Sequence, residues 1–492
     1  MSQTTSTTTT TTMFFFCSFS VHLLLLLLFF FFFFTFSSFL SISSASAIHH
    51  VEKTHNFQQT SNMDPRELET LFNIMETISS DQNWRISHPN PCKTESSWIG
   101  IECKTGINGS PLTHVSRLDF GVPPNPTCKI TAKFPSNIFQ LPFLESVFFI
   151  QCFTQTLTTI SFPQIQILIS SSLQQLSIRS NPSLIGSIPS QISSLKSLQI
   201  LTLSQNKLRG KIPEEIFKLD SLVHLDLSYN LLSGIIPFQI GNVKNLVGLD
   251  LSYNSLTGII PDTIGELGIL QKLDLSSNSL TGAIPESIGN LHSLVFIALS
   301  NNKFHGNFPH GLTNLQNLQY FIMDDNPMFI SLPSDFGLLQ KLQELRLANS
   351  GYSGTIPSTY SKLSNLSTLS LQNNRLTGRI PVSFGSLLHI YHLNLSRNFL
   401  DGVVPFNSSF LKRLGRNLDL TGNSGLCLMN PSEANGFNLG VSVCGKNNKS
   451  NSMIEPWMKK SEAQIGFKTS VLLISISIIL VFKYLFLPIL QL

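Results

Sequence analysis

Three aspartates recur at a fixed spacing, and aspartate is a residue type that can take part in catalysis. Asp226, Asp250 and Asp274 follow one another at intervals of 24 residues, and each lies between two leucines. Two carboxylates held close together can act as general acid and base. The flanking leucines recur at the same interval, however. We therefore interpret the three aspartates as consensus residues of a structural repeat rather than as a catalytic pair.

The rest of the sequence also argues against catalysis. Serines and histidines recur with the same period and are not expected to converge, and no HExxH, GxSxG or glycine-rich phosphate-binding motif occurs. Lys and Arg total 32 against 28 Asp and Glu, a net charge of +4 without a basic stripe. The sequence predicts a protein that is not an enzyme, needs no cofactor or metal and has no nucleic-acid partner.

A repeat of 24 residues organises the chain, and it is clearest in 198–213, LQILTLSQNKLRGKIP. Its asparagines recur at this step, with Ser350 in the place of one of them and one-residue slips at the two ends. They are Asn181, Asn206, Asn230, Asn254, Asn278, Asn302, Asn326, Asn374, Asn398 and Asn423. A period of this length that reads LxxLxLxxNxLxGxIP is typical of a leucine-rich repeat.

The residues of one repeat predict its conformation. Leu225 and Leu227 alternate with polar residues, which is strand periodicity with the leucines inward. The expected outward residues are Val223, His224, Asp226 and Ser228. The asparagine can bond the backbone of the turn, the glycine fits a tight turn and the outer arm has room for one 3-10 turn. We predict an α/β solenoid of about twelve coils, a curved horseshoe about 55 Å long with a concave parallel sheet and a cap at each end.

The motif NxLxGxIP resembles the plant extracellular class of leucine-rich repeat proteins. The segment 64–103, DPRELETLFNIMETISSDQNWRISHPNPCKTESSWIGIEC, carries the most specific resemblance. It is similar to the N-terminal cap of the Piriformospora indica-insensitive group, which is related to the Too Many Mouths type of receptor-like protein. Apolar residues at helical spacing within it predict a short capping helix over 67–78, with Asp64 as N-cap and Pro65 at the first position.

The cysteine count predicts three disulfides. Seven cysteines become six if Cys17 leaves with a secretory signal, and an even number is typical of a disulfide-bonded secreted chain. The resemblance implies that Cys92 and Cys103 close the N-terminal cap, and two cysteines alone are too few for a metal site. Cys427 and Cys444 lie just past the last repeat and fit a C-terminal cap.

The third cysteine pair lies in an irregular stretch of repeats, residues 112–172. Cys128 and Cys152 are one repeat apart, so they can lie side by side on adjacent coils. The alternative is that Cys152 only replaces a repeat asparagine, which would leave Cys128 as a free thiol. We favour the disulfide.

Departures from the repeat consensus mark the expected binding surface. A concave solenoid face is by default a surface for proteins or peptides. In three successive coils, aromatic, aliphatic and charged residues replace the consensus at positions expected to face outward. These residues are Phe296, Tyr320, Ile322, Asp324, Asp325 and Arg346. Their composition is typical of binding hot spots, and the alternative is drift of the repeat without a site.

The two ends of the chain predict secretion and anchoring. Residues 1–47 contain no charged side chain and hold a long Phe and Leu run before Ala45-Ser46-Ala47, which predicts a cleaved signal peptide starting at Met1 or Met13, or else an uncleaved anchor. We expect a linker and cysteine cap in 48–111, repeats in 112–426, and a C-terminal cap and polar spacer in 427–468. The apolar residues 469–492, interrupted by Lys483, predict a membrane anchor: a transmembrane helix or a GPI signal.

Five N-glycosylation acceptors fit the secretory route: Asn108, Asn365, Asn394, Asn407 and Asn448. Asn394 lies between two strand leucines, so a glycan there would limit access to the concave face.

The resemblance implies a receptor-like protein at the plasma membrane that faces outward and lacks a kinase. Such proteins bind peptide or protein ligands and join a receptor kinase in the perception of microbes, in symbiosis and defence, or in development. The alternative is a secreted or wall-associated inhibitor of a microbial wall-degrading enzyme, similar to polygalacturonase-inhibiting proteins. The apolar tail favours the receptor.

Overall fold

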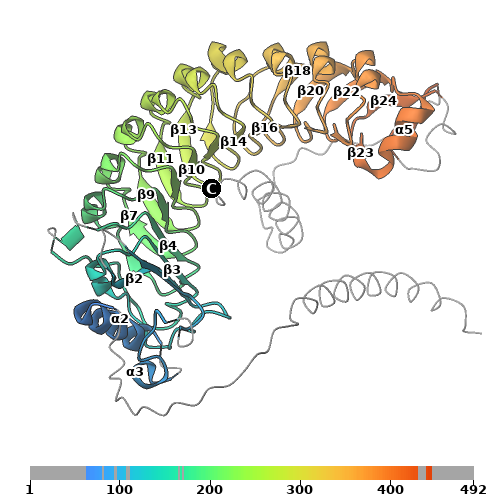
Figure 1. The fold of residues 1–492 in the computed structure, drawn as a ribbon. Helices are drawn as coiled ribbons and strands as arrows, with labels where there is room; N and C mark the ends of the chain where they lie inside the picture. Colours follow the sequence, from blue (N-terminus) through green and yellow to red (C-terminus); the bar gives the residue numbers. More distant parts are fainter. Residues whose placement is uncertain are drawn as a thin grey trace, which may run out of the picture. The chain divides into compact units, whose positions relative to one another are not determined.

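The computed structural model describes residues 63–79, 82–93, 97–106, 111–164, 167–168, 171–429 and 439–445. The predicted signal peptide, the residues up to 62 and the predicted anchor lie outside these ranges. Among the described residues, no helix has the length and apolarity needed to cross a bilayer. Within the described part each repeat is one coil, and successive coils stack along a curve (Figure 1).

A 14-stranded sheet follows the inner side of the curve. Its first two strands are antiparallel, and every later neighbour is parallel. In spatial order the strands are β1 (Ile101–Thr105), β2 (Thr113–Phe120), β3 (Ser146–Ile150), β4 (Gln175–Arg179), β6 (Ile200–Thr202), β8 (His224–Asp226), β10 (Gly248–Asp250), β12 (Lys272–Asp274), β14 (Phe296–Ala298), β16 (Tyr320–Ile322), β17 (Glu344–Arg346), β19 (Thr368–Ser370), β21 (His392–Asn394) and β23 (Leu418–Asp419). The predicted concave parallel sheet is confirmed.

The strand leucines are buried as predicted, Leu225 and Leu227 among them. Ser228 was expected to face outward, and this was wrong. Ser228 is buried because its hydroxyl donates a 2.7 Å hydrogen bond to the Asp226 carboxylate, which folds the side chain back beside the strand.

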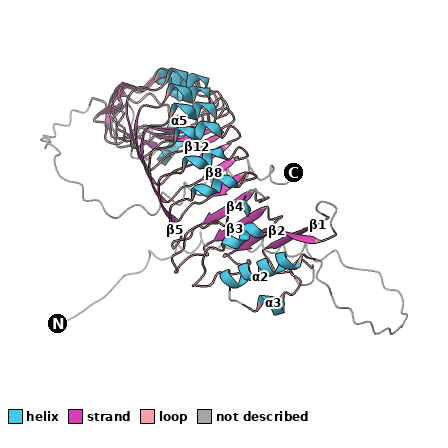
Figure 2. Cartoon of the chain, turned by 90° about the vertical axis from the view of Figure 1, so that its left-hand side faces the viewer, coloured by secondary structure: helices cyan, strands magenta, loops and turns pink. Residues whose placement is uncertain are grey.

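Short 3-10 turns line the outer side of the curve, as the outer-arm length predicts (Figures 1 and 2). Those of the regular coils begin directly after a proline, whose fixed φ suits the entry into the turn. The 3-10 segments are η2 (Ser136–Gln140), η3 (Ser190–Ser194), η4 (Glu214–Lys218), η5 (Phe238–Asn242), η6 (Asp262–Glu266), η7 (Glu286–Asn290), η8 (His310–Asn314), η9 (Ser334–Leu338), η10 (Ser358–Lys362), η11 (Val382–Ser386) and η12 (Gly415–Asn417).

Between the inner sheet and the outer turns lies a lateral layer, which is divided along the chain into two sheets. The first has six parallel strands: β5 (Ile185–Gly186), β7 (Lys207–Gly210), β9 (Leu231–Gly234), β11 (Ser255–Gly258), β13 (Ser279–Gly282) and β15 (Lys303–Phe304). The second has five: β18 (Ser353–Thr355), β20 (Arg375–Arg379), β22 (Phe399–Val403), β24 (Gly425–Leu428) and β25 (Ser442–Val443). The lateral layer is therefore interrupted between β15 and β18.

The repeat asparagines bond the backbone of neighbouring coils, as predicted. Asn302 is typical: its Oδ1 accepts from the N–H of Leu280 at 3.0 Å, and its Nδ2 donates to the carbonyls of Leu275 and Leu299 at 2.9 and 3.1 Å. Each such side chain satisfies buried backbone groups of two coils at once. Ser350, which replaces an asparagine, keeps only part of this pattern and donates to the carbonyl of Ala348 at 2.8 Å.

The N-terminal cap contains the predicted helix, α2 (Pro65–Ile78), followed by α3 (Trp84–Ser87). The Asp64 carboxylate accepts from two backbone N–H groups of the first turn of α2. Glu67 ties the helix to the sheet: its carboxylate accepts from the N–H of Val115 at 2.8 Å and lies 2.7 Å from Nδ1 of His114. Both side chains of this Glu67–His114 pair are buried.

Three disulfides are present, Cys92–Cys103, Cys128–Cys152 and Cys427–Cys444, with Cα–Cα distances of 5.6, 4.9 and 5.0 Å. Cys152 pairs with Cys128 and also holds the position of a repeat asparagine, where its N–H donates to Oδ1 of Asn181 at 2.7 Å. The favoured disulfide is therefore present, and Cys128 is not a free thiol. At the C-terminal end, helix α5 (Ser408–Leu414) precedes the Cys427–Cys444 disulfide.

Candidate functional site

The sheet register brings four of the six predicted site residues onto adjacent strands. Phe296 on β14 pairs with Tyr320 on β16, which pairs with Glu344 on β17. In the same register Ile322 lies beside Arg346. The rings of Phe296 and Tyr320 have centroids 6.0 Å apart, a separation at which aromatic pairs attract each other.

The aromatic pair is half-buried and charged groups surround it. Nζ of Lys272 lies 5.9 Å from the centroid of the Phe296 ring, on one side of the pair. On the other side the Tyr320 hydroxyl lies 3.3 Å from Oε1 of Gln343. Partial burial and the nearby Glu344 carboxylate raise the pKa of Tyr320, so the hydroxyl stays protonated and can donate.

Asp324 is buried and does not face outward on the concave sheet, which corrects the sequence prediction. The residue is 5% exposed. Its Oδ2 accepts from Nε of Arg346 at 2.8 Å, and its Oδ1 accepts from the N–H of Ala348 at 2.7 Å. The carboxylate is therefore used within the fold, because it takes the place of the serine that is buried at this position in consensus coils. Arg346 is its counterion, and it remains half-exposed beside Ile322.

Asp325 is exposed but lies on the turn after β16, where its φ is +59°. Aspartate tolerates this left-handed conformation better than most residues. Partial burial, and to a lesser extent the Asp324 carboxylate, raises the pKa of Asp325. The strand part of the predicted site thus reduces to Phe296, Tyr320, Ile322 and Arg346, which we call the concave patch.

The consensus aspartates are structural, as their period predicts. Oδ1 of Asp250 accepts from both the N–H and the hydroxyl of Ser252, at 3.1 and 2.7 Å. Asp226 and Asp274 make the same bonds to the serines that follow them. Lys272 adds a 2.7 Å ion pair to Asp250. Each carboxylate therefore accepts hydrogen bonds from the serine that follows its own strand.

Comparison with known proteins agrees with the repeat architecture. Models of the leucine rich repeat family match residues 171–232, 229–280 and 244–304, and a single-repeat model matches 365–387. The chain is 68% identical to Receptor like protein 29 of Arabidopsis thaliana over 148 residues, 30% of this chain and 31% of that protein. It is 32% identical to Piriformospora indica-insensitive protein 2 of Arabidopsis thaliana over 147 residues, 29% of this chain and 34% of that protein. The matched stretches span about a third of each relative.

Solved structures with the same fold include plant receptor ectodomains. The ectodomain of the Arabidopsis receptor kinase HAESA, in complex with an extended IDA peptide hormone, aligns with a TM-score of 0.59 at 28% identity over 74% of this chain and 57% of that one. The plant peptide hormone receptor RGFR1, in complex with RGF2, aligns with a TM-score of 0.54 at 31% identity over 64% of this chain and 47% of that one.

This chain has the leucine-rich repeat fold. It resembles plant receptor-like proteins of the two kinds matched above, and the resemblance to the Piriformospora indica-insensitive group is confirmed.

Three of the five predicted glycosylation sites of this chain lie in the described residues. Asn365 and Asn407 are exposed, and Asn407 also caps helix α5. Asn394 is half-buried on β21, and its Oδ1 accepts from the N–H and hydroxyl of Ser396, as a consensus aspartate would. Asn108 and Asn448 lie outside the described residues. Attachment of glycans at these positions stays a prediction.

A search of the described residues for clusters of three or more His, Cys, Asp or Glu side chains that could hold a metal ion finds none.

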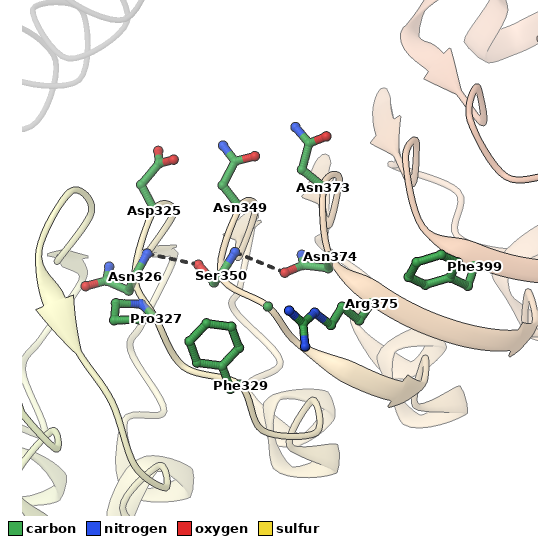
Figure 3. Close-up of a pocket in the computed structure, with 11 residues that line it drawn as sticks. Asp325, Asn326, Pro327, Phe329, Asn349, Ser350, Asn373, Asn374, Arg375 and Phe399 are labelled. Atoms are coloured by element: carbon green, nitrogen blue, oxygen red, sulfur yellow. Dashed lines mark hydrogen bonds between the residues drawn. The ribbon is translucent and has the colours of Figure 1, made fainter. Parts of the chain in front are cut away.

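The sequence analysis missed a pocket beside the concave patch. It has a volume of about 720 Å³ and opens where the lateral layer is interrupted (Figure 3). Of the predicted site residues only Asp325 lines it. A signal was present in the sequence: Ser350 replaces a repeat asparagine, and NPMFISLP at 326–333 departs from the NxLxGxIP consensus.

Proposed function

We propose that this protein is a cell-surface receptor-like protein that binds a peptide or protein ligand on its concave sheet and acts with a receptor kinase in signalling. The processes in which we expect it to act are microbe perception, symbiosis and defence, or development. The HAESA ectodomain, which shares its fold, is in complex with a peptide hormone, and the plant peptide hormone receptor RGFR1 is in complex with RGF2. The predicted signal peptide and anchor support placement at the plasma membrane, facing outward.

One observation carries the proposal: the Phe296–Tyr320 pair on the inner sheet. On the other three-residue strands of the sheet the equivalent position holds no aromatic ring of Phe, Tyr or Trp: it is held by Ile200, His224, Gly248, Lys272, Glu344, Thr368 and His392. Two adjacent aromatic side chains offer a partner a large and rigid apolar contact. The neighbouring cations Lys272 and Arg346 are already paired with Asp250 and Asp324, so the apolar contact is what supports the proposal.

The test replaces the aromatic pair and leaves the buried ion pair intact. Arg346→Ala is unsuitable, since it would strand the buried Asp324 carboxylate and destabilise the fold. A library of synthetic secreted plant peptides would be screened against the purified protein by surface plasmon resonance. We expect at least one peptide to bind saturably, and Phe296→Ala with Tyr320→Ala to weaken it by about ten-fold or more.

The matched control is Tyr229→Ala with Tyr253→Ala. These tyrosines stack at 4.1 Å on regular coils and are each 42% exposed, so their loss removes a similar aromatic area elsewhere on the arc. If this control weakens peptide binding as much as the patch variant does, the ligand does not bind at the concave patch.

A further inference from the structure

The lateral layer is interrupted for an identifiable reason. In regular coils the asparagine Oδ1 accepts from the N–H two residues past the preceding asparagine, as Asn302 does from Leu280. The Ser350 side chain is too short for this contact. The N–H groups of Met328 and Phe329 instead donate to the carbonyl of Ser350, at 3.1 and 3.2 Å.

The altered path turns an aromatic side chain outward. Phe329 adopts a φ of +49° and is 60% exposed. Pro327, two residues earlier, has no N–H and cannot donate to a lateral strand. The ring packs directly on Gly351, where a Cβ atom would lie only 2.4 Å from it. The lack of a side chain at 351 therefore lets the Phe329 ring lie against the backbone of the next coil.

The walls of the resulting pocket are aromatic and cationic. Phe399, at the far end, is 65% exposed. The Arg375 guanidinium lies 5.4 Å from the centroid of the Phe329 ring. No ion pair of Arg375 is found among the described residues, so its donors are available to a ligand. Figure 3 shows Phe329 and Arg375 below the line of buried hydrogen bonds that joins Asn326, Ser350 and Asn374, and Phe399 to the right of that line.

The opposite rim is a row of planar polar groups. Asp325, Asn349 and Asn373 precede the repeat asparagine in three successive coils, and all three are exposed. Their side chains point in the same direction (Figure 3), and the strand spacing separates neighbours by about 4.8 Å. Regular coils hold Tyr229, Tyr253 and Ser277 at this position, but the coil before the pocket holds the exposed Asn301, so the polar row extends one coil beyond the pocket lining.

We propose that this pocket binds a short neutral oligosaccharide. Sugar rings present apolar C–H faces that stack on exposed aromatic rings such as Phe399 and Phe329. Their hydroxyl groups both donate and accept. A carboxylate, two carboxamides and a guanidinium are planar groups that can each serve two adjacent hydroxyls. The regular step of the polar row is close to the length of one unit in an extended β-linked glycan, so successive units can meet successive coils.

A peptide is a poorer fit to this pocket. A peptide that adds as a strand needs unpaired backbone groups at a sheet edge. Here the N–H groups of Met328, Phe329 and Ser353 all have backbone partners, Ser353 donating to Ile330 at 2.9 Å. The pocket lining holds one carboxylate, Asp325, and one guanidinium, Arg375, and together they give no net charge that would select a charged ligand.

The experiment measures binding of defined sugars to the purified full-length protein by isothermal titration calorimetry. The probes are cellotetraose, xylotetraose and chitotetraose, with tetragalacturonate as the charged comparison. We expect at least one neutral tetrasaccharide to bind saturably. Phe399→Ala and Arg375→Ala should each lower its affinity by about ten-fold, the loss of one stacking or charge-assisted contact. Both side chains are exposed, so melting temperatures should not change.

The matched controls hold the same repeat position, directly after the asparagine, in regular coils. Lys207→Ala and Leu231→Ala should leave sugar affinity unchanged. The proposal is overturned if no neutral probe binds at millimolar concentration, if only tetragalacturonate binds, or if the controls lose as much affinity as the pocket variants. It is also overturned if the pocket variants lose a library peptide instead of a sugar. Because the concave-patch variants leave the pocket intact, failure here is distinguishable from failure of the peptide-receptor proposal.

Discussion

The position of Asp274 in the repeat disfavours the charged form of its carboxylate. Its Oδ1 accepts from the N–H and hydroxyl of Ser276, but Asp250 occupies the same position one strand away. Burial first, and then the Asp250 charge, raises the pKa of Asp274 to about 6. Lys272, which pairs with Asp250, offsets only part of this effect.

The raised pKa predicts a pH-dependent stability. The ordinary pKa of an aspartate is about 3.9, so the folded state holds the Asp274 proton more tightly than the unfolded chain does. The stabilising contribution is complete below about pH 4 and is lost as the pH rises through about 6. We expect Asp274→Asn to raise the melting temperature at pH 7 and to change it little at pH 4, as measured by differential scanning fluorimetry.

The substitution is conservative because Asn394 already holds this position and makes the same two bonds to Ser396. A larger effect of Asp274→Asn at pH 4 than at pH 7 would contradict the assignment of the pH dependence to this carboxylate.

The repeat asparagines give a second prediction at the scale of single residues. Asn302→Ala leaves the buried N–H of Leu280 and the carbonyls of Leu275 and Leu299 without their partner. The expected loss is about 1–3 kcal/mol of unfolding free energy, measured by urea denaturation. Asn302→Ser should cost less, because the Ser350 hydroxyl donates at 3.4 Å to the carbonyl of Met323, which is the equivalent of the Leu275 carbonyl. Equal losses for the two variants would show that the hydrogen bonds are not the cause.

At the scale of elements, the two caps cover the ends of the buried leucine core. A single coil cannot bury its own leucines, so an end without a cap exposes apolar surface. Helix α2 covers one end, with the buried Glu67–His114 contact joining it to β2. Helix α5 and the Cys427–Cys444 disulfide lie at the other.

Loss of either cap disulfide should impair folding. We expect Cys92→Ser or Cys427→Ser to cost about 2–5 kcal/mol and to cause retention in the secretory pathway. Surface labelling and glycosidase sensitivity of the expressed protein would measure this retention. Normal surface levels of both variants would show that the caps are dispensable.

At the scale of the whole molecule, the open question is the anchor, because the predicted segment 469–492 lies outside the described residues. If the segment is a GPI signal, phosphatidylinositol-specific phospholipase C should release the protein from membranes, since only the lipid then holds it. If it is a transmembrane helix, only detergent should release it. Immunoblots of membrane and supernatant fractions distinguish the two, and release by a salt wash alone would contradict both.

The sequence by itself determined the coil, its period and its caps. The leucines, asparagines, glycines and prolines act within one repeat or on its nearest neighbour, so a 24-residue pattern specifies the strand, the turn and the 3-10 arm locally. The same locality placed Phe296 beside Tyr320, because a constant step in a parallel sheet aligns equivalent positions.

Only the tertiary structure decided which polar residues are free to bind. Asp324 is a residue type expected at a binding site. Its carboxylate, however, accepts hydrogen bonds from Arg346 and from the N–H of Ala348, which lie 22 and 24 residues further along the chain. The pocket likewise depends on Ser350 being too short to bond Met328, on Gly351 accepting the Phe329 ring and on Phe399 from a third coil. These are contacts between coils, whose outcome depends on side-chain length and backbone path, and the repeat pattern does not encode either.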